Sequence, residues 1–89
     1  MASETYRSKN GQHYFKFRFV QNGSICNIYC DKHPGFNGKN TNPEKTHLFR
    51  SGKICFYAGK EPANIQKARK LAGQWAEYML EYRRTGITQ

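Results

Sequence analysis

Residues 13–20 have the sequence HYFKFRFV, and their strict alternation of polar and apolar side chains decides the fold. One side of an extended chain would carry Phe15, Phe17 and Phe19. The opposite side would carry Tyr14, Lys16 and Arg18. A period of two residues is typical of a half-buried β-strand. The Asn22-Gly23 pair that follows is a strong hairpin signal, so the sequence predicts a return strand over about residues 24–31.

Downstream of this hairpin the chain predicts a loop, a second hairpin and a helix. Residues 32–45, KHPGFNGKNTNPEK, are rich in Pro, Gly and Asn and predict a long loop of the kind that often has a function. Residues 46–50 and 53–58 are short apolar runs on either side of Ser51-Gly52, which predicts two more strands. From Pro62 onward, apolar residues recur every three or four positions up to Gly86, which predicts a helix of about 23 residues.

The expected fold class is therefore α+β. We expect an antiparallel four-stranded β-meander, made of two hairpins, with one long C-terminal helix packed across one face. In this interpretation residues 1–12 are a flexible N-terminus, residues 13–86 form a single α+β domain and residues 87–89 are a C-terminal tail. We expect Phe15, Phe17 and Phe19 to pack under the helix against Trp75.

The composition limits the classes of protein that come into question. The chain has 89 residues, with 15 Lys and Arg against six Asp and Glu, which gives a net charge of +9. No apolar run reaches the ~20 residues of a membrane helix, and three cysteines without an export signal indicate reduced thiols. We therefore expect a cytoplasmic protein, monomeric, without a membrane partner, and neither a membrane protein nor a secreted disulfide scaffold.

The positive charge favours an anionic partner, of which nucleic acid is the commonest. Aromatic rings beside cations on an uncovered sheet face could stack on bases while the cations hold phosphates. The candidate contact residues are Tyr14, Lys16, Arg18, Tyr29, Lys39 and Arg50. Two alternatives stay open, namely a protein-interaction domain with an acidic partner and a merely solvated surface on which such residues are common.

Cysteine and histidine side chains offer a metal site as another hypothesis. The candidates are Cys26, Cys30, His33, His47 and Cys55. On one strand Cys26 and Cys30 are four residues apart, roughly 13 Å, too far to share an ion. Only Cys30, His33, His47 and Cys55 could converge, and only through the long loop. We therefore expect small buried thiols and loop histidines, with no metal and no cofactor.

The segments THLFRSGKICFY, residues 46–57, and WAEYMLEYRRTG, residues 75–86, carry a family resemblance. They resemble the catalytic stretch and following helix of the ubiquitin-conjugating enzyme fold, especially its short bacterial relatives. The resemblance makes His47, Gly52, Ile54 and Cys55 motif positions. It implies that Cys55 is the thioester-forming cysteine of a thiol carrier. The competing interpretation places Cys55 in the core of a fourth strand.

Other enzyme signatures are missing from the sequence. The chain contains no GxGxxG, P-loop or HExxH motif, and its six acidic residues include no evident general acid–base pair. The preferred hypothesis is a non-enzymatic module that binds nucleic acid through a basic and aromatic sheet face.

Overall fold

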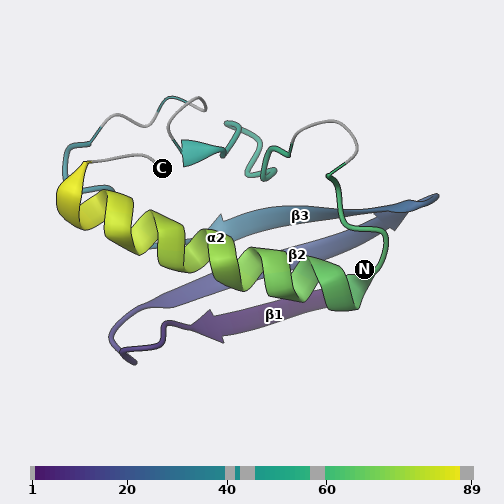
Figure 1. Ribbon diagram of the computed structural model, residues 1–89, viewed down its shortest axis with the longest axis horizontal. Coiled ribbons are helices and arrows are strands. Elements are labelled where there is room, and N and C mark those ends of the chain that lie inside the picture. Colours follow the sequence, from purple (N-terminus) through teal and green to yellow (C-terminus); the bar gives the residue numbers. More distant parts are fainter. Residues whose placement is uncertain (1, 40–41, 43–45, 57–59, 87–89) are drawn as a thin grey trace.

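The computed structural model describes residues 2–39, 42, 46–56 and 60–86. Its three strands are β1 (Ala2–Arg7), β2 (Tyr14–Asn22) and β3 (Ile25–Lys32), and they form one antiparallel sheet in the order β1-β2-β3. The helix α2 (Ile65–Thr85) lies across one face of this sheet (Figure 1). The α+β class and the single C-terminal helix are therefore confirmed.

The predicted hairpin is present as β2 and β3. Arg18 lies opposite Tyr29, and Phe19 lies opposite Ile28. Gly23, in the turn, has a φ of 64°, a left-handed conformation that glycine adopts without a steric cost. The strict alternation of HYFKFRFV therefore sends one row of β2 side chains under α2 and the other row to the opposite face.

The prediction of four strands is wrong, because the sheet has three. In place of the second hairpin, the described residues of the segment 46–56 form only two isolated bridges, Leu48 with Ile54 and Tyr29 with Lys53. His47 has a φ of 56° and Gly52 a φ of 90°. A left-handed residue such as His47 interrupts an extended strand, and pairing across the turn is limited to a few hydrogen bonds, such as the Phe49 amide to the Lys53 carbonyl at 2.9 Å. Residues 57 and 58 of the predicted strand lie outside the described residues.

The first strand, β1, lies where the sequence analysis expected a flexible N-terminus. Its residues pair with β2 from Ala2 opposite Phe19 to Arg7 opposite Tyr14. Two of its side chains make polar contacts with α2: Glu4 forms an ion pair with Arg69, and the Tyr6 hydroxyl donates to a Glu77 carboxylate oxygen at 2.6 Å. These contacts tie the edge strand β1 to the helix.

The helix α2 is slightly shorter than predicted and begins after Pro62. Asn64 is its N-cap, and the Asn64 side chain accepts a hydrogen bond from the Lys67 amide at 3.0 Å. The helix ends at Gly86, which has left-handed dihedral angles and donates its amide to the Tyr82 carbonyl at 2.7 Å. Within the described residues, no helix is long and apolar enough to cross a membrane.

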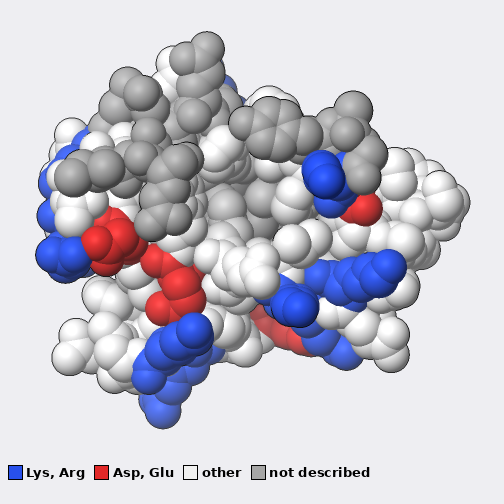
Figure 2. Space-filling view, in the orientation of Figure 1, with Lys and Arg blue, Asp and Glu red and all other residues white. Residues whose placement is uncertain are grey.

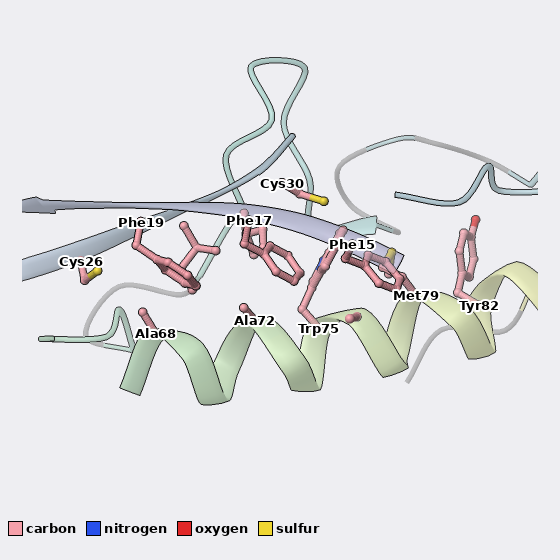
Figure 3. Packing of buried hydrophobic residues seen from close by; sticks show 13 residues of the cluster. Phe15, Phe17, Phe19, Cys26, Cys30, Ala68, Ala72, Trp75, Met79 and Tyr82 are labelled. Atoms are coloured by element: carbon pink, nitrogen blue, oxygen red, sulfur yellow. The ribbon is translucent and has the colours of Figure 1, made fainter. Parts of the chain in front are cut away.

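The core lies between the β2 phenylalanines and α2. Figure 3 shows Phe15, Phe17 and Phe19 directed toward the helix, with Ala68 and Ala72 below them. Trp75 packs edge-on against both Phe15 and Phe17, with ring centroids 6.0 Å apart in each pair. Its indole Nε1 donates to the Thr46 carbonyl at 2.9 Å. The expected packing of the phenylalanine row against Trp75 is confirmed.

Candidate nucleic-acid interface

The open face of the sheet is the face that α2 does not cover. Alternation places four of the predicted contact residues on it, namely Tyr14, Lys16, Arg18 and Tyr29. Tyr14 is 53% exposed, which is high for a large aromatic side chain. The structure therefore brings together the aromatic and basic residues that the strand pattern assigned to one face.

Three further cations belong to this face. Arg7 on β1 lies opposite Tyr14 on β2, and Lys32 on β3 lies opposite Lys16 on β2. Lys53 forms a bridge with Tyr29. Directly opposed residues of an antiparallel pair direct their side chains to the same side of the sheet. Arg7 could not be predicted because residues 2–7 carry no strand pattern, and Lys32 was expected in the loop. Lys53 could have been found only from its pairing with β3.

Two arginines of the open face lie over tyrosine rings. The Arg7 guanidinium carbon is 4.9 Å from the centroid of the Tyr14 ring, and that of Arg18 is 4.3 Å from the Tyr29 ring. Both distances lie within the ~6 Å range of cation–π attraction. Arg7 also donates a hydrogen bond to the Tyr14 hydroxyl. These contacts hold both rings and both guanidinium groups in place on the sheet surface.

The pair of Lys16 and Lys32 is electrostatically unfavourable. The two residues face each other across β2 and β3, at a register shift where Asp31 is the extra residue. The Asp31 carboxylate forms an ion pair with Arg18 at 3.3 Å. Among the described residues, neither Lys16 nor Lys32 has an ion-pair partner. Like charges directly opposite each other destabilise a sheet, and an anion placed between them would relieve this cost.

Acidic side chains lie mainly on the other side of the molecule. Glu4 and Arg69 form an ion pair at 2.6 Å, Glu81 pairs with Arg84, and Glu77 accepts from Tyr6. In Figure 2, which shows the α2 side, blue and red side chains lie next to each other. On the open face, Asp31 is the one acidic residue within the described part of β1, β2 and β3. Within the described part of the three strands, the cations of the open face therefore outnumber its acidic side chains.

The other two predicted contact residues lie elsewhere. The Lys39 side chain packs beside Gly86, at the C-terminal end of α2. Arg50 is exposed in the turn of the segment 46–56. Residues 40, 41 and 43–45 of the predicted contact loop are outside the described residues.

Cys55 lies in a groove and not in the core. The groove has a volume of about 300 Å³ and separates α2 from the segment 46–56, with His47, Cys55, Leu71, Trp75 and Tyr78 in its lining. The Cys55 side chain is half-buried, and its amide donates to the His47 carbonyl at 2.7 Å. The expectation of Cys55 as a core residue of a fourth strand is therefore wrong. His47 and Cys55, two of the motif positions of the resemblance, therefore lie side by side.

The other two cysteines are buried. Desolvation by burial raises the pKa of the Cys26 thiol and raises that of Cys30 to about 12. Within the described residues, no three His, Cys, Asp or Glu side chains are grouped as a metal ion would require. The metal-site candidates therefore do not converge in the part of the chain that the structure describes.

The chain was compared with protein-family models, with curated proteins and with solved structures. None of the three comparisons gave a significant match.

Proposed function

We propose that this protein binds nucleic acid through the open face of its sheet. The observation that carries the proposal is the set of five cations around two tyrosine rings on a face with one acidic residue in its strands. These cations are Arg7, Lys16, Arg18, Lys32 and Lys53. Lysine and arginine side chains neutralise phosphates and release counterions, while tyrosine rings stack on bases.

A binding titration against salt tests the proposal. Labelled DNA and RNA oligonucleotides would be titrated at about 50 mM and 200 mM salt, with fluorescence anisotropy as the readout. We expect the affinity to fall steeply with salt, because each phosphate contact contributes about 0.7–0.9 to the slope of log K against log salt. Absence of binding to every oligonucleotide at the lower salt concentration would contradict the proposal.

A pair of charge-matched variants locates the surface. Lys16→Gln with Lys53→Gln removes two cations of the open face. Lys67→Gln with Lys70→Gln removes two exposed cations from α2. We expect the first variant to lower the affinity and reduce the salt slope by about 1.4–1.8, and the second to leave both close to wild type. Equal losses in the two variants would mean that net charge, and not this face, determines binding.

An acidic protein partner would use the same cations, and polyglutamate distinguishes it. A chain of carboxylates offers charge without bases. If polyglutamate binds with the affinity of an oligonucleotide of equal charge, the tyrosines contribute nothing and the protein-interaction alternative is favoured.

A second candidate function is favoured by the position of Cys55. A thiol outside the core, next to His47 and open to a groove, is what the resemblance to ubiquitin-conjugating enzymes implies for a thiol carrier. In such a reaction the Cys55 sulfur would attack the carbonyl of a thioester donor. The new S–C bond forms at Cys55, the S–C bond of the donor breaks, and the donor thiol leaves with the proton that Cys55 gives up.

Alkylation of the folded protein tests this candidate. We expect Cys55 to react with iodoacetamide faster than Cys26 and Cys30, whose burial protects them and raises their pKa. Cys55→Ser should remove the fast phase, and His47→Gln should change its pH profile if the imidazole assists the thiol. A fast phase with the pH dependence of a free thiol, unaffected by His47→Gln, would argue against an activated nucleophile.

A further inference from the structure

We propose that the open face selects a single strand of nucleic acid, with a phosphate held between Lys16 and Lys32 and unpaired bases stacked on Tyr14 and Tyr29. This inference rests on the proposed function and specifies its substrate class. It follows from three properties of the face. These are its breadth, the cation–π contacts of its two tyrosine rings, and the position of the two lysines that have no ion-pair partner among the described residues.

The breadth of the face does not suit a duplex. Three strands and the bridged residue Lys53 give four chain segments side by side. At a spacing of about 4.8 Å they span roughly 14 Å before side chains are added. The major groove of B-DNA is about 12 Å wide and admits a helix or a two-stranded ribbon. A sheet of this breadth cannot enter the groove, and would meet a duplex only along its phosphates.

The rings of Tyr14 and Tyr29 can stack only on bases that are not already stacked within a duplex. The Arg7 guanidinium lies over one side of the Tyr14 ring, and Arg18 lies over the Tyr29 ring in the same way. If a base stacked on the other side of either ring, the tyrosine would lie between the guanidinium group and the base. Bases inside a duplex are covered on both sides by their neighbours, so only unpaired bases can make this contact.

The phosphate position follows from the lysine pair. Lys16 and Lys32 are opposed, both are exposed, and no acidic side chain of the described residues is paired with either. Lys16 is two residues from Tyr14 along β2, so the two side chains are about 7 Å apart on the same face. A phosphate at the lysine pair would therefore lie next to a base on the Tyr14 ring.

The decisive experiment compares strands and rings in one series. A labelled single strand of about 10 nucleotides, within the range that one small domain covers, would be titrated beside the duplex of the same sequence. We expect the single strand to bind at least tenfold more tightly than the duplex. Tyr14→Ala should weaken binding of the single strand about fivefold or more, the loss of one stacked base, and should leave duplex binding unchanged.

Two control variants separate stacking from other effects. Tyr14→Phe keeps the ring and loses only the hydroxyl that accepts from Arg7, so it should retain most of the single-strand affinity. Lys32→Gln should weaken binding of the single strand and lower the salt slope by about 0.7. Because Tyr14 is mostly exposed, Tyr14→Ala should fold, and unchanged Trp75 fluorescence would show this directly.

The possible outcomes distinguish a failure of the single-strand inference from a failure of the proposed function. Equal or tighter binding of the duplex would overturn the single-strand inference and leave the proposed function intact. Equal losses with Tyr14→Ala and Tyr14→Phe would also overturn it, because the ring would then not be the contact. Absence of binding to either oligonucleotide would overturn both the inference and the proposed function.

Discussion

In the proposed function, Lys32 favours binding of an anion at a cost in stability. Lys32 lies opposite Lys16 across β2 and β3, and it has no ion-pair partner among the described residues. Directly opposed like charges cost roughly 0.2–1 kcal/mol in a sheet. A protein that had no use for an anion at this point would gain from any neutral residue there.

Lys32→Gln is therefore expected to stabilise the fold. Urea unfolding followed by Trp75 fluorescence should show an increase in the free energy of unfolding of a few tenths to about 1 kcal/mol at low salt. The gain should vanish near 1 M salt, where surface charges are screened. Lys70→Gln, on the exposed side of α2, is the matched control and should change little. A loss of stability in Lys32→Gln would show that Lys32 supports the fold.

Four of the seven residues of the open face could be predicted, and the exceptions, Arg7, Lys32 and Lys53, depend on strand pairing. Tyr14, Lys16 and Arg18 follow from a period of two, and Tyr29 follows from the hairpin register. Arg7 and Lys53 depend on pairings that no local pattern encodes. The position of Cys55 depends likewise on where the segment 46–56 leaves the sheet, which is set by the left-handed residues His47 and Gly52.

Among the elements, β1 was the hardest to predict, because two of its contacts to α2 are an ion pair and a hydrogen bond. A strand is normally recognised by apolar side chains on one face, yet the inward positions of ASETYR include Glu4 and Tyr6. Their partners Arg69 and Glu77 lie more than 60 residues away in sequence. The hairpin and the helix carry their own apolar periodicity and were predictable. The strand β1 could not be predicted from its own residues, because the partners of its inward side chains lie on α2.

The contact between β1 and α2 makes stability depend on alkaline pH. The hydrogen bond to Glu77, together with burial, raises the pKa of Tyr6 from 10.0 to about 12. Above pH 10 the unfolded chain releases the Tyr6 proton while the folded chain retains it. The free energy of unfolding should therefore fall as the pH rises from about 10 to 12. Burial of Cys30, whose pKa is also about 12, should add to the fall from about pH 9 upward.

Tyr6→Phe separates the two contributions. The variant cannot ionise at this position, so its stability should decline less steeply between pH 10 and 12, with the decline due to the buried thiols Cys26 and Cys30 remaining. Thermal unfolding at a series of pH values measures both slopes. Parallel curves for the two proteins would contradict the assignment to Tyr6.

The whole molecule depends on one contact region in which α2, β2 and the segment 46–56 meet. Trp75 packs against Phe15 and Phe17, and its Nε1 binds the Thr46 carbonyl. Ala68, Ala72 and Ala76 are small and buried, which lets the helix lie close to the sheet. The same packing leaves the opposite face of the sheet uncovered by α2, so the proposed interface depends on this core.

Trp75→Ala should therefore remove a large part of the stability of the fold. Truncation of a buried tryptophan costs about 3–5 kcal/mol, and a domain of this size has a total stability of about 5–10 kcal/mol. Far-ultraviolet circular dichroism and urea unfolding measure the loss. Trp75→Phe is the control: it keeps an aromatic ring against Phe15 and Phe17 but loses the bond to Thr46, and should cost about 1–2 kcal/mol. In the wild type, Trp75 fluorescence should be blue-shifted and poorly quenched by iodide, because the indole is 7% exposed. If iodide quenched Trp75 as it quenches free tryptophan, α2 would not lie on the phenylalanine row, and the open face would lose the scaffold that positions its cations and rings.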